Sequence, residues 1–185
     1  MTAILEREIK LRFDSADVAR AAVLATGATP THGRRLQEDC LLDTDDEDLH
    51  RRRSGLRVRI EGGKSLLTFK GPVQPSDFKI REEIETIVGD GTLTLSILEA
   101  LGYRVWFRYQ KYREEFAFDD CIIAIDETPV GVFVEIEGGE RGIENTARAL
   151  GRAPCDYLFD SYRGLFLLHC RQHGTAGADM LFDAE

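Results

Sequence analysis

The sequence lacks any apolar run of roughly 18 residues or more, which argues against a membrane-spanning segment. Its start, residues 1–6, has neither the basic nor the apolar stretch of a secretion signal. Cysteine is scarce, and the four cysteines are too widely spaced to form a Cys-x-x-Cys pair, so we expect reduced thiols rather than a disulfide or a metal site. From these absences we predict a cytoplasmic protein that does not act on membranes.

An excess of positive charge is also absent. The chain has 24 Lys and Arg against 33 Asp and Glu, a formal net charge of -9. A general nucleic-acid surface is therefore not expected, whereas a local basic pocket for a small anion remains compatible with this charge. The length of 185 residues suits a single domain. We expect that domain to span 1–170, with a flexible tail at 171–185, and leave the choice between monomer and homodimer open.

Charged residues instead alternate with apolar ones, first in the stretch 5–13. Side chains on a strand point to opposite faces in turn, so one face of this stretch is charged and the other mostly apolar. The charged face holds Glu6, Glu8, Lys10 and Arg12, and the apolar face holds Leu5, Ile9, Leu11 and Phe13. Taken alone, such a stretch is an ordinary half-buried strand with a solvated face.

The same two-faced pattern returns along the chain, and this repetition is the main signal in the sequence. We expect about eight strands, joined mostly by hairpins such as the one at Gly62-Gly63. The expected strands are 5–13, 35–43, 55–61, 64–70, 79–88, 103–118, 121–126 and 130–137. Helices are expected after residue 14, after residue 92, over 143–150 and over 156–169. If the helices cover the apolar faces, the charged faces turn inward. The predicted fold is therefore α+β: a closed eight-stranded antiparallel barrel with helices packed outside and a polar interior.

The charges of that interior are balanced. The candidate basic residues are Lys10, Arg57, Arg59, Lys70, Arg81, Lys111 and Arg113, and the candidate acidic ones are Glu6, Glu8, Glu83, Glu85, Asp126, Glu135 and Glu137. They could form a salt-bridge lattice or a passive anion channel, but burying many ion pairs costs several kcal/mol per ion. A ligand with several phosphates, carried with a divalent ion, would use both sets, because Arg and Lys suit phosphate oxygens and Glu-x-Glu pairs suit Mg²⁺ or Mn²⁺.

An ordered set of short motifs resembles the CYTH superfamily, the triphosphate tunnel metalloenzymes, which include class IV adenylate cyclases, thiamine triphosphatases and inorganic triphosphatases. The set comprises Glu6-x-Glu8-x-Lys10, Leu56-Arg57-Val58-Arg59, Thr68-Phe69-Lys70-Gly71, Arg81-Glu82-Glu83-Ile84-Glu85, Lys111-Tyr112-Arg113, Asp126, Phe133-Val134-Glu135-Ile136-Glu137 and Ser161-Tyr162. The run Asp39-Cys40-Leu41-Leu42-Asp43 departs from the Tyr-Phe-Asp common in that family.

The resemblance implies a tunnel that binds triphosphate through basic residues and divalent metal, Mg²⁺ or Mn²⁺, through acidic ones. The implied phosphate-binding residues are Lys10, Arg57, Arg59, Lys70, Arg81 and Arg113. The implied metal ligands are Glu6, Glu8, Asp126, Glu135 and Glu137, with Glu83 and Glu85 in support. For catalysis it points to Lys111, beside the leaving phosphate, together with Glu135 and Glu137.

Three functions are compatible with these residues. The first is metal-dependent hydrolysis of inorganic triphosphate or of a nucleoside or organic triphosphate. The second is conversion of ATP to cyclic AMP and pyrophosphate, which needs an adenine site at a tunnel mouth. Tyr103 and Trp106 are aromatic candidates, although ordinary packing is the favoured interpretation of both. The third is a non-catalytic binder of polyphosphate or nucleotide. We expect His50 and Arg51 to Arg53 to be solvated loop residues.

Overall fold

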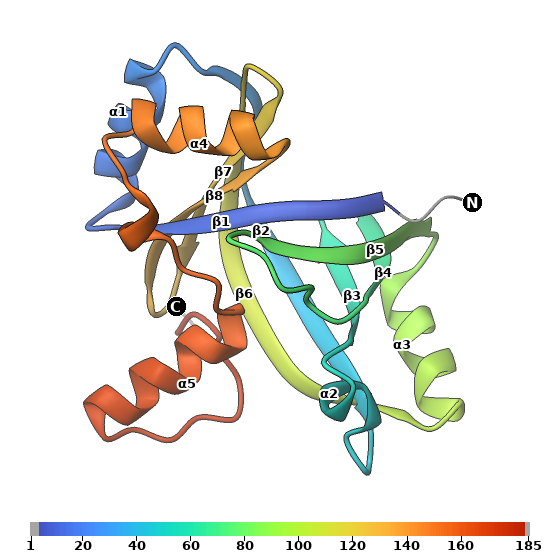
Figure 1. The fold of residues 1–185 in the computed structure, drawn as a ribbon. Helices are drawn as coiled ribbons and strands as arrows, with labels where there is room; N and C mark the ends of the chain where they lie inside the picture. The colour runs from blue at the N-terminus through green and yellow to red at the C-terminus, as the bar shows by residue number, and fades with distance from the viewer. Residues whose placement is uncertain (1–3, 184–185) are drawn as a thin grey trace.

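The computed structural model describes residues 4–183. Its eight antiparallel strands close into a barrel in the order β1-β5-β4-β3-β2-β6-β7-β8 (Figure 1), which confirms the predicted fold class. The strands are β1 (Ile4–Phe13), β2 (Thr29–Thr44), β3 (Gly55–Glu61), β4 (Lys64–Lys70), β5 (Lys79–Val88), β6 (Tyr103–Phe118), β7 (Cys121–Thr128) and β8 (Gly131–Glu137).

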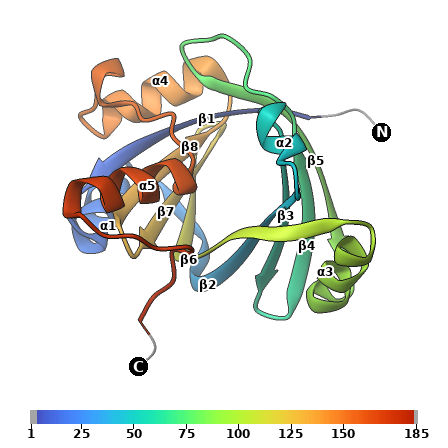
Figure 2. The same ribbon diagram turned by 90° about the horizontal axis from the view of Figure 1, so that it is seen from below.

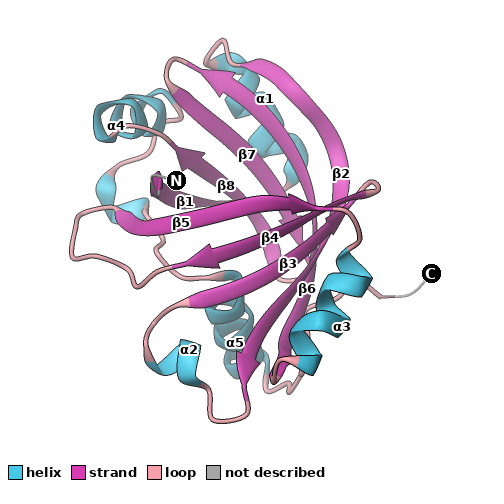
Figure 3. Ribbon diagram, turned by 90° about the vertical axis from the view of Figure 1, so that its right-hand side faces the viewer, coloured by secondary structure: helices cyan, strands magenta, loops and turns pink. Residues whose placement is uncertain are grey.

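Five helices surround the barrel: α1 (Ala16–Ala25), α2 (Asp48–Arg51), α3 (Gly91–Ala100), α4 (Glu140–Ala149) and α5 (Tyr162–His173), with a short 3-10 turn at Pro154–Asp156. Ser15 caps α1 by accepting the Val18 amide, as its position before an alanine-rich stretch predicts. Asp90 caps α3, and its carboxylate accepts the Leu93 amide. Figure 3 shows α1 and α4 together at one end of the wall and α2 and α5 at the other.

The larger apolar core lies outside the barrel, between the wall and the helices α1 and α4. It contains the outward residues of β1, β7 and β8 together with Ala19 and Val23 of α1 and Ile143 and Ala147 of α4. On β1 the consecutive residues Ile9, Lys10 and Leu11 are all at most 2% exposed. Both faces of this strand are therefore buried, the apolar one under helices and the charged one inside the barrel.

A second apolar cluster lies at one end of the barrel, between α5 and the strands β6 and β8. Phe107, Tyr109 and Phe133 point inward from the wall and pack against Tyr162 and Phe166 of α5. Figure 2 shows α5 over the β6, β7 and β8 side of the opening, with α3 on the opposite side against β3 and β4. This cluster packs beneath the polar residues of the barrel interior.

The C-terminal region differs from expectation in two places. The last helix begins at Tyr162 rather than near residue 156, because Pro154 starts a 3-10 turn and Ser161 supplies the N-cap. Leu158, predicted on that helix, instead pairs with Lys10 of β1. Within the expected flexible tail, 171–173 continue α5, and Met180 is 1% exposed and pairs with β6 through Tyr109. The tail is therefore attached to β6 around Met180, whereas 171–178 are exposed; 184–185 lie outside the described residues.

Within residues 4–183, none of the helices has the length and apolar character that a membrane crossing requires.

Neighbouring residues of β7 test the position of the outer core. Ile123 is 0% exposed and belongs to the core, whereas Ile122 is 52% exposed. We expect Ile123→Ala to lower the free energy of unfolding by about 2–5 kcal/mol, because it leaves a cavity under α1 and α4. The control Ile122→Ala should change it by about 0.5 kcal/mol. Urea denaturation of both variants measures the difference, and equal losses would contradict an apolar core outside the wall.

Candidate active site

The barrel encloses one elongated cavity of about 660 Å³. Of the fourteen predicted site residues, thirteen line it: Glu6, Glu8, Lys10, Arg57, Arg59, Lys70, Arg81, Glu83, Glu85, Lys111, Arg113, Glu135 and Glu137. They meet because a period of two puts them on the inner face of six strands that the barrel brings together. Asp126 is the exception, since it is fully buried behind the cavity surface.

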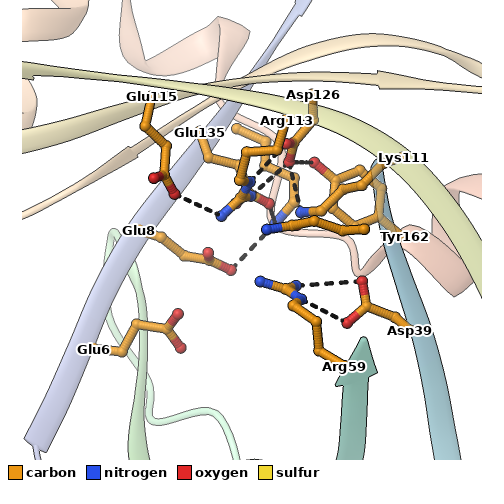
Figure 4. Close-up of polar contacts among 12 residues, drawn as sticks. Glu6, Glu8, Asp39, Arg59, Lys111, Arg113, Glu115, Asp126, Glu135 and Tyr162 are labelled. Carbon is orange, nitrogen blue, oxygen red and sulfur yellow. Dashed lines mark hydrogen bonds and ion pairs between the residues drawn. The ribbon is translucent and has the colours of Figure 1, made fainter. Parts of the chain in front are cut away.

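Asp126 organises the deepest part of the site (Figure 4). Its carboxylate accepts hydrogen bonds from Lys111 at 2.8 Å, from Arg113 at 2.7 and 2.6 Å, and from the Tyr162 hydroxyl. Although burial opposes ionisation, Arg113 and Lys111 hold the pKa of Asp126 below its ordinary value. Both carboxylate oxygens thus already have donors, and Asp126 positions the two basic residues.

Lys111 is the most deeply buried basic side chain of the cavity wall, at 1% exposure. Burial first, and then the neighbouring Arg113, lower the pKa of its ammonium to about 8, while Asp126 and Glu135 oppose this shift. The Lys111 ammonium also lies 4.7 Å from the centre of the Tyr162 ring. It is therefore held between an aromatic face and a carboxylate.

A second chain of charges crosses the wall from β8 to β5. Glu135 contacts Arg113 and lies 3.1 Å from Lys10, Lys10 lies 3.1 Å from Glu8, and Glu8 lies 2.6 Å from Lys79. The strand register explains this order, because Lys10 faces Glu135 and Glu8 faces both Glu137 and Lys79 in the sheet. Despite burial, the adjacent ammonium groups keep the pKa values of Glu8 and Glu135 below the ordinary range.

Asp39 holds two phosphate-binding candidates on the opposite wall. Its buried carboxylate accepts two hydrogen bonds from Arg59, at 2.9 and 3.3 Å, and lies 3.5 Å from Arg57 (Figure 4). The sequence reasoning missed this role, since it treated Asp39 as part of a departure from a family motif. Alternation was the available signal, because Arg35, Gln37 and Asp39 fall at every second position of β2.

Carboxylates gather at β1, β5 and β8. Lys70 bridges Glu6 and Glu83 at 2.7 and 2.5 Å, whereas Glu137 makes no ion pair with any residue of the described chain. Burial, followed by the charges of Glu6, Glu8 and Glu83, raises the pKa of Glu137 to about 7. The pKa of Glu6 is also raised, by burial and by Glu8. This corner of the cavity carries more negative charge than its lysines neutralise.

The donor chemistry of this corner fits a divalent cation, because hard ions such as Mg²⁺ and Mn²⁺ prefer carboxylate oxygens. Across residues 4–183 no three acidic, histidine or cysteine side chains form a ready-made metal cluster. Instead, ammonium groups lie among the carboxylates: Lys70 contacts Glu6, and Lys10 and Lys79 contact Glu8. The raised pKa of Glu137 marks the place where a further positive charge would be stabilised.

Some basic groups also keep donors for a ligand. The Nε atoms of Arg57 and Arg81 are buried and make no hydrogen bond with the described residues, although Asp39 lies 3.5 Å from the first and Glu6 lies 3.6 Å from the second. An unpaired buried donor is costly, and an anion in the cavity would supply the missing acceptors. The cavity can therefore bind an oxyanion as well as a cation.

Further basic residues line the cavity although the sequence analysis did not select them. Lys79 stands two positions before Arg81 on β5. Arg35, near the middle of β2, pairs with Glu61 at 2.5 Å and with Glu115 at 2.8 Å. Alternation would have found both. No such signal identified His50, Arg53, Trp106 and Arg163, which also line the cavity.

Comparisons with known proteins agree with this geometry. A Methanocaldococcus jannaschii protein that is provisionally named an adenylate cyclase is 30% identical over 135 residues, 72% of this chain and 77% of its own. A structure from Vibrio parahaemolyticus, with the same provisional name, has a TM-score of 0.76 at 21% identity, covering 90% of this chain and 99% of its own. A provisionally named adenylyl cyclase from Hippeastrum, described as having a dominant triphosphatase activity, has a TM-score of 0.64 at 20% identity and covers 92% of this chain and 97% of its own. Residues 5–150 match the CYTH domain. The chain therefore belongs to the CYTH domain family, whose members are metal-dependent enzymes that bind triphosphate substrates.

Proposed function

We propose that this protein is a hydrolase that cleaves a triphosphate inside the barrel with the help of Mg²⁺ or Mn²⁺. The observation that carries the proposal is that one cavity holds two kinds of incompletely paired group. Arg57 and Arg81 have buried Nε donors without a hydrogen bond among the described residues, and burial together with the neighbouring carboxylates raises the pKa of Glu137. A salt-bridge lattice alone would leave neither donors nor surplus negative charge.

The basic residues would bind the phosphate chain from several strands at once. Arg57 and Arg59 are aligned by Asp39, and Arg113 is aligned by Asp126. A guanidinium that is fixed in this way offers a phosphate two donors without first losing side-chain freedom. Lys10, Lys70 and Arg81 complete the proposed phosphate-binding set.

The carboxylates of Glu6, Glu8, Glu135 and Glu137 would hold the divalent ion, supported by Glu83 and Glu85. When bound, such an ion neutralises phosphate charge and lowers the pKa of a coordinated water. We assign Asp126 to the positioning of Lys111 and Arg113 rather than to this set, because its two oxygens already accept four hydrogen bonds.

Lys111 is proposed to stabilise the negative charge that develops on the leaving phosphate. Its ammonium is buried and is anchored 2.8 Å from Asp126, so little reorganisation is needed as charge develops. Burial also strengthens its attraction to a phosphate relative to that of a solvated lysine.

We favour hydrolysis over cyclisation. Hydrolysis needs only phosphate binding and a metal-held water, whereas cyclisation also needs groups that bring the ribose 3′-hydroxyl to the α-phosphate. The name of the Methanocaldococcus relative favours the cyclase, and the dominant activity described for the Hippeastrum protein favours the triphosphatase.

Product analysis separates these activities. We expect purified protein to release orthophosphate from inorganic triphosphate, ATP or thiamine triphosphate only when Mg²⁺ or Mn²⁺ is present, and from one of the three well above the others. Cyclic AMP and pyrophosphate from ATP would replace this proposal with the cyclase. Tight metal-independent binding without any product would replace it with the non-catalytic binder.

Glu137 tests the metal assignment. We expect Glu137→Gln to lower turnover by about 100-fold and to abolish the rise in Tm that Mg²⁺ or Mn²⁺ produces in the wild type. Without metal, its Tm should equal or exceed that of the wild type, because the substitution removes repulsion from Glu6 and Glu8. The control Glu99→Gln changes an exposed residue of α3 and should retain both turnover and the metal effect. An unchanged metal effect in Glu137→Gln would refute the assignment.

Asp126 tests the distinction between positioning residue and metal ligand. We expect Asp126→Asn to lower the free energy of unfolding in EDTA by about 3–5 kcal/mol, because the buried charges of Lys111 and Arg113 lose their partner. Asp77→Asn, at an exposed position between β4 and β5, is the matched control. Chemical denaturation gives both values. If Asp126→Asn kept its stability and lost only the metal-induced rise in Tm, Asp126 would belong with the metal ligands.

A further inference from the structure

Trp106 lines the cavity because of an irregularity in the sheet. Leu41 of β2 pairs with Phe107 of β6, but the next residue, Leu42, pairs with Val105. Trp106 is therefore the extra residue of a β-bulge, and bulges turn a side chain away from its regular direction. The bulge accounts for an indole at the cavity wall next to the regularly alternating Phe107.

Two groups from distant parts of the chain surround the indole. The Arg163 guanidinium, from the first turn of α5, lies 3.8 Å from the centre of the Trp106 ring, and the His50 ring centre lies 4.9 Å away. Arg53, whose amide donates to the carbonyl of His50, also lines the cavity from the segment after α2. We call these four residues, His50, Arg53, Trp106 and Arg163, the tunnel-mouth cluster. The distance to Arg163 means that the guanidinium covers a face of the indole.

The loop that carries His50 and Arg53 is held in place. The buried carboxylate of Asp43 accepts the backbone amides of Thr44, Leu49 and His50 at 2.8–2.9 Å. The amide of Arg53 donates to the carbonyl of His50, and Arg53 adopts a positive φ of 56°. A non-glycine residue in this conformation needs support from its surroundings. His50 and Arg51 to Arg53 are exposed, as expected, but the loop that carries them has a defined shape.

The tunnel-mouth cluster differs from the rest of the cavity in its charge. Lys10, Lys70, Lys111 and Arg113 each contact a carboxylate within 3.1 Å. In contrast, neither Arg53 nor Arg163 forms an ion pair with any described residue. Glu47 influences the pKa of Arg163, but it lies beyond ion-pair distance. Asp43 is occupied by backbone amides. The other aspartates of this loop pair with different arginines: Asp45 with Arg104, Asp46 with Arg51 and Asp48 with Arg52.

Two unpaired guanidinium groups at the end of a phosphate-binding cavity favour an anion over a neutral group. A base that stacked on Trp106 would have to compete with Arg163, which already lies over the ring. The start of α5 adds partial positive charge at Ser161, which also lines the cavity. The second arginine, Arg53, would have no role in stacking.

We propose that the tunnel-mouth cluster binds a further phosphoryl group, so that the preferred substrate is a phosphate chain longer than a triphosphate. This proposal rests on the proposed function only in that both place a phosphate chain in the cavity. Arg53 and Arg163 would bind the extra group, Trp106 would hold Arg163 in position, and His50 would close the side of the site. Both an inorganic polyphosphate and a nucleoside tetraphosphate carry the required group.

Calorimetric titration in EDTA tests the proposal without turnover or metal. We expect the wild type to bind inorganic tetraphosphate about tenfold more tightly than inorganic triphosphate, because the fourth group adds contacts with two arginines. The double variant Arg53→Ala/Arg163→Ala should reduce this ratio to about one to two, with little change in triphosphate binding. Arg141→Ala, an exposed arginine of α4 that does not line the cavity, should keep the full ratio.

Titration with ATP and adenosine tetraphosphate separates the two sources. Equal binding of adenosine tetraphosphate and inorganic tetraphosphate assigns the cluster to the phosphate group alone. A wild-type ratio near one, or an equal loss for triphosphate and tetraphosphate in the double variant, would overturn the proposal. ATP binding tighter than either inorganic chain, and lost in the double variant, would assign the cluster to a nucleoside instead. Since these titrations need no catalysis, they stay informative if no hydrolysis is found.

Discussion

The burial of charge inside a closed wall is the constraint on which this structure depends. The barrel encloses acidic and basic side chains that solvent cannot fully neutralise, and an unpaired buried charge costs several kcal/mol. Most of these charges are therefore paired across strands, as Lys10 is with Glu8 and Glu135. The strand register makes such pairing possible, and the apolar core outside the wall keeps the register in place.

Where pairing is incomplete, the structure indicates function. Arg57 and Arg81 keep buried donors, Glu137 has a raised pKa among other carboxylates, and Arg163 has no carboxylate partner within the described chain. These positions occupy different parts of one cavity. In our proposals the phosphate chain supplies the missing acceptors, and the metal supplies the missing cation. The extra phosphoryl group pairs with the unpaired arginines.

Carboxylates of the same type have different environments, and this decides their proposed roles. Asp126 and Asp39 are fully buried and saturated with donors, so they act as anchors for arginine and lysine. Glu6 and Glu137 face other carboxylates, and their pKa values are raised. The position of a residue along a strand predicts which face of the barrel it lies on. It does not distinguish the anchoring aspartates from the glutamates with raised pKa values, because that distinction depends on which strands become neighbours.

The sequence by itself determined the eight-stranded barrel and its charged interior, since a period of two places side chains on one face wherever the strand lies. The same period of two places Lys79 and Asp39 on the inner face, so the sequence was sufficient to predict both positions. Only the tertiary structure decided that Asp126 anchors Lys111 and that Met180 packs on β6. It alone also brought His50, Trp106 and Arg163 together, because a β-bulge, a short helix and the start of α5 meet there without any shared periodicity. Local patterns report the face of one element, whereas such contacts depend on how separate elements pack.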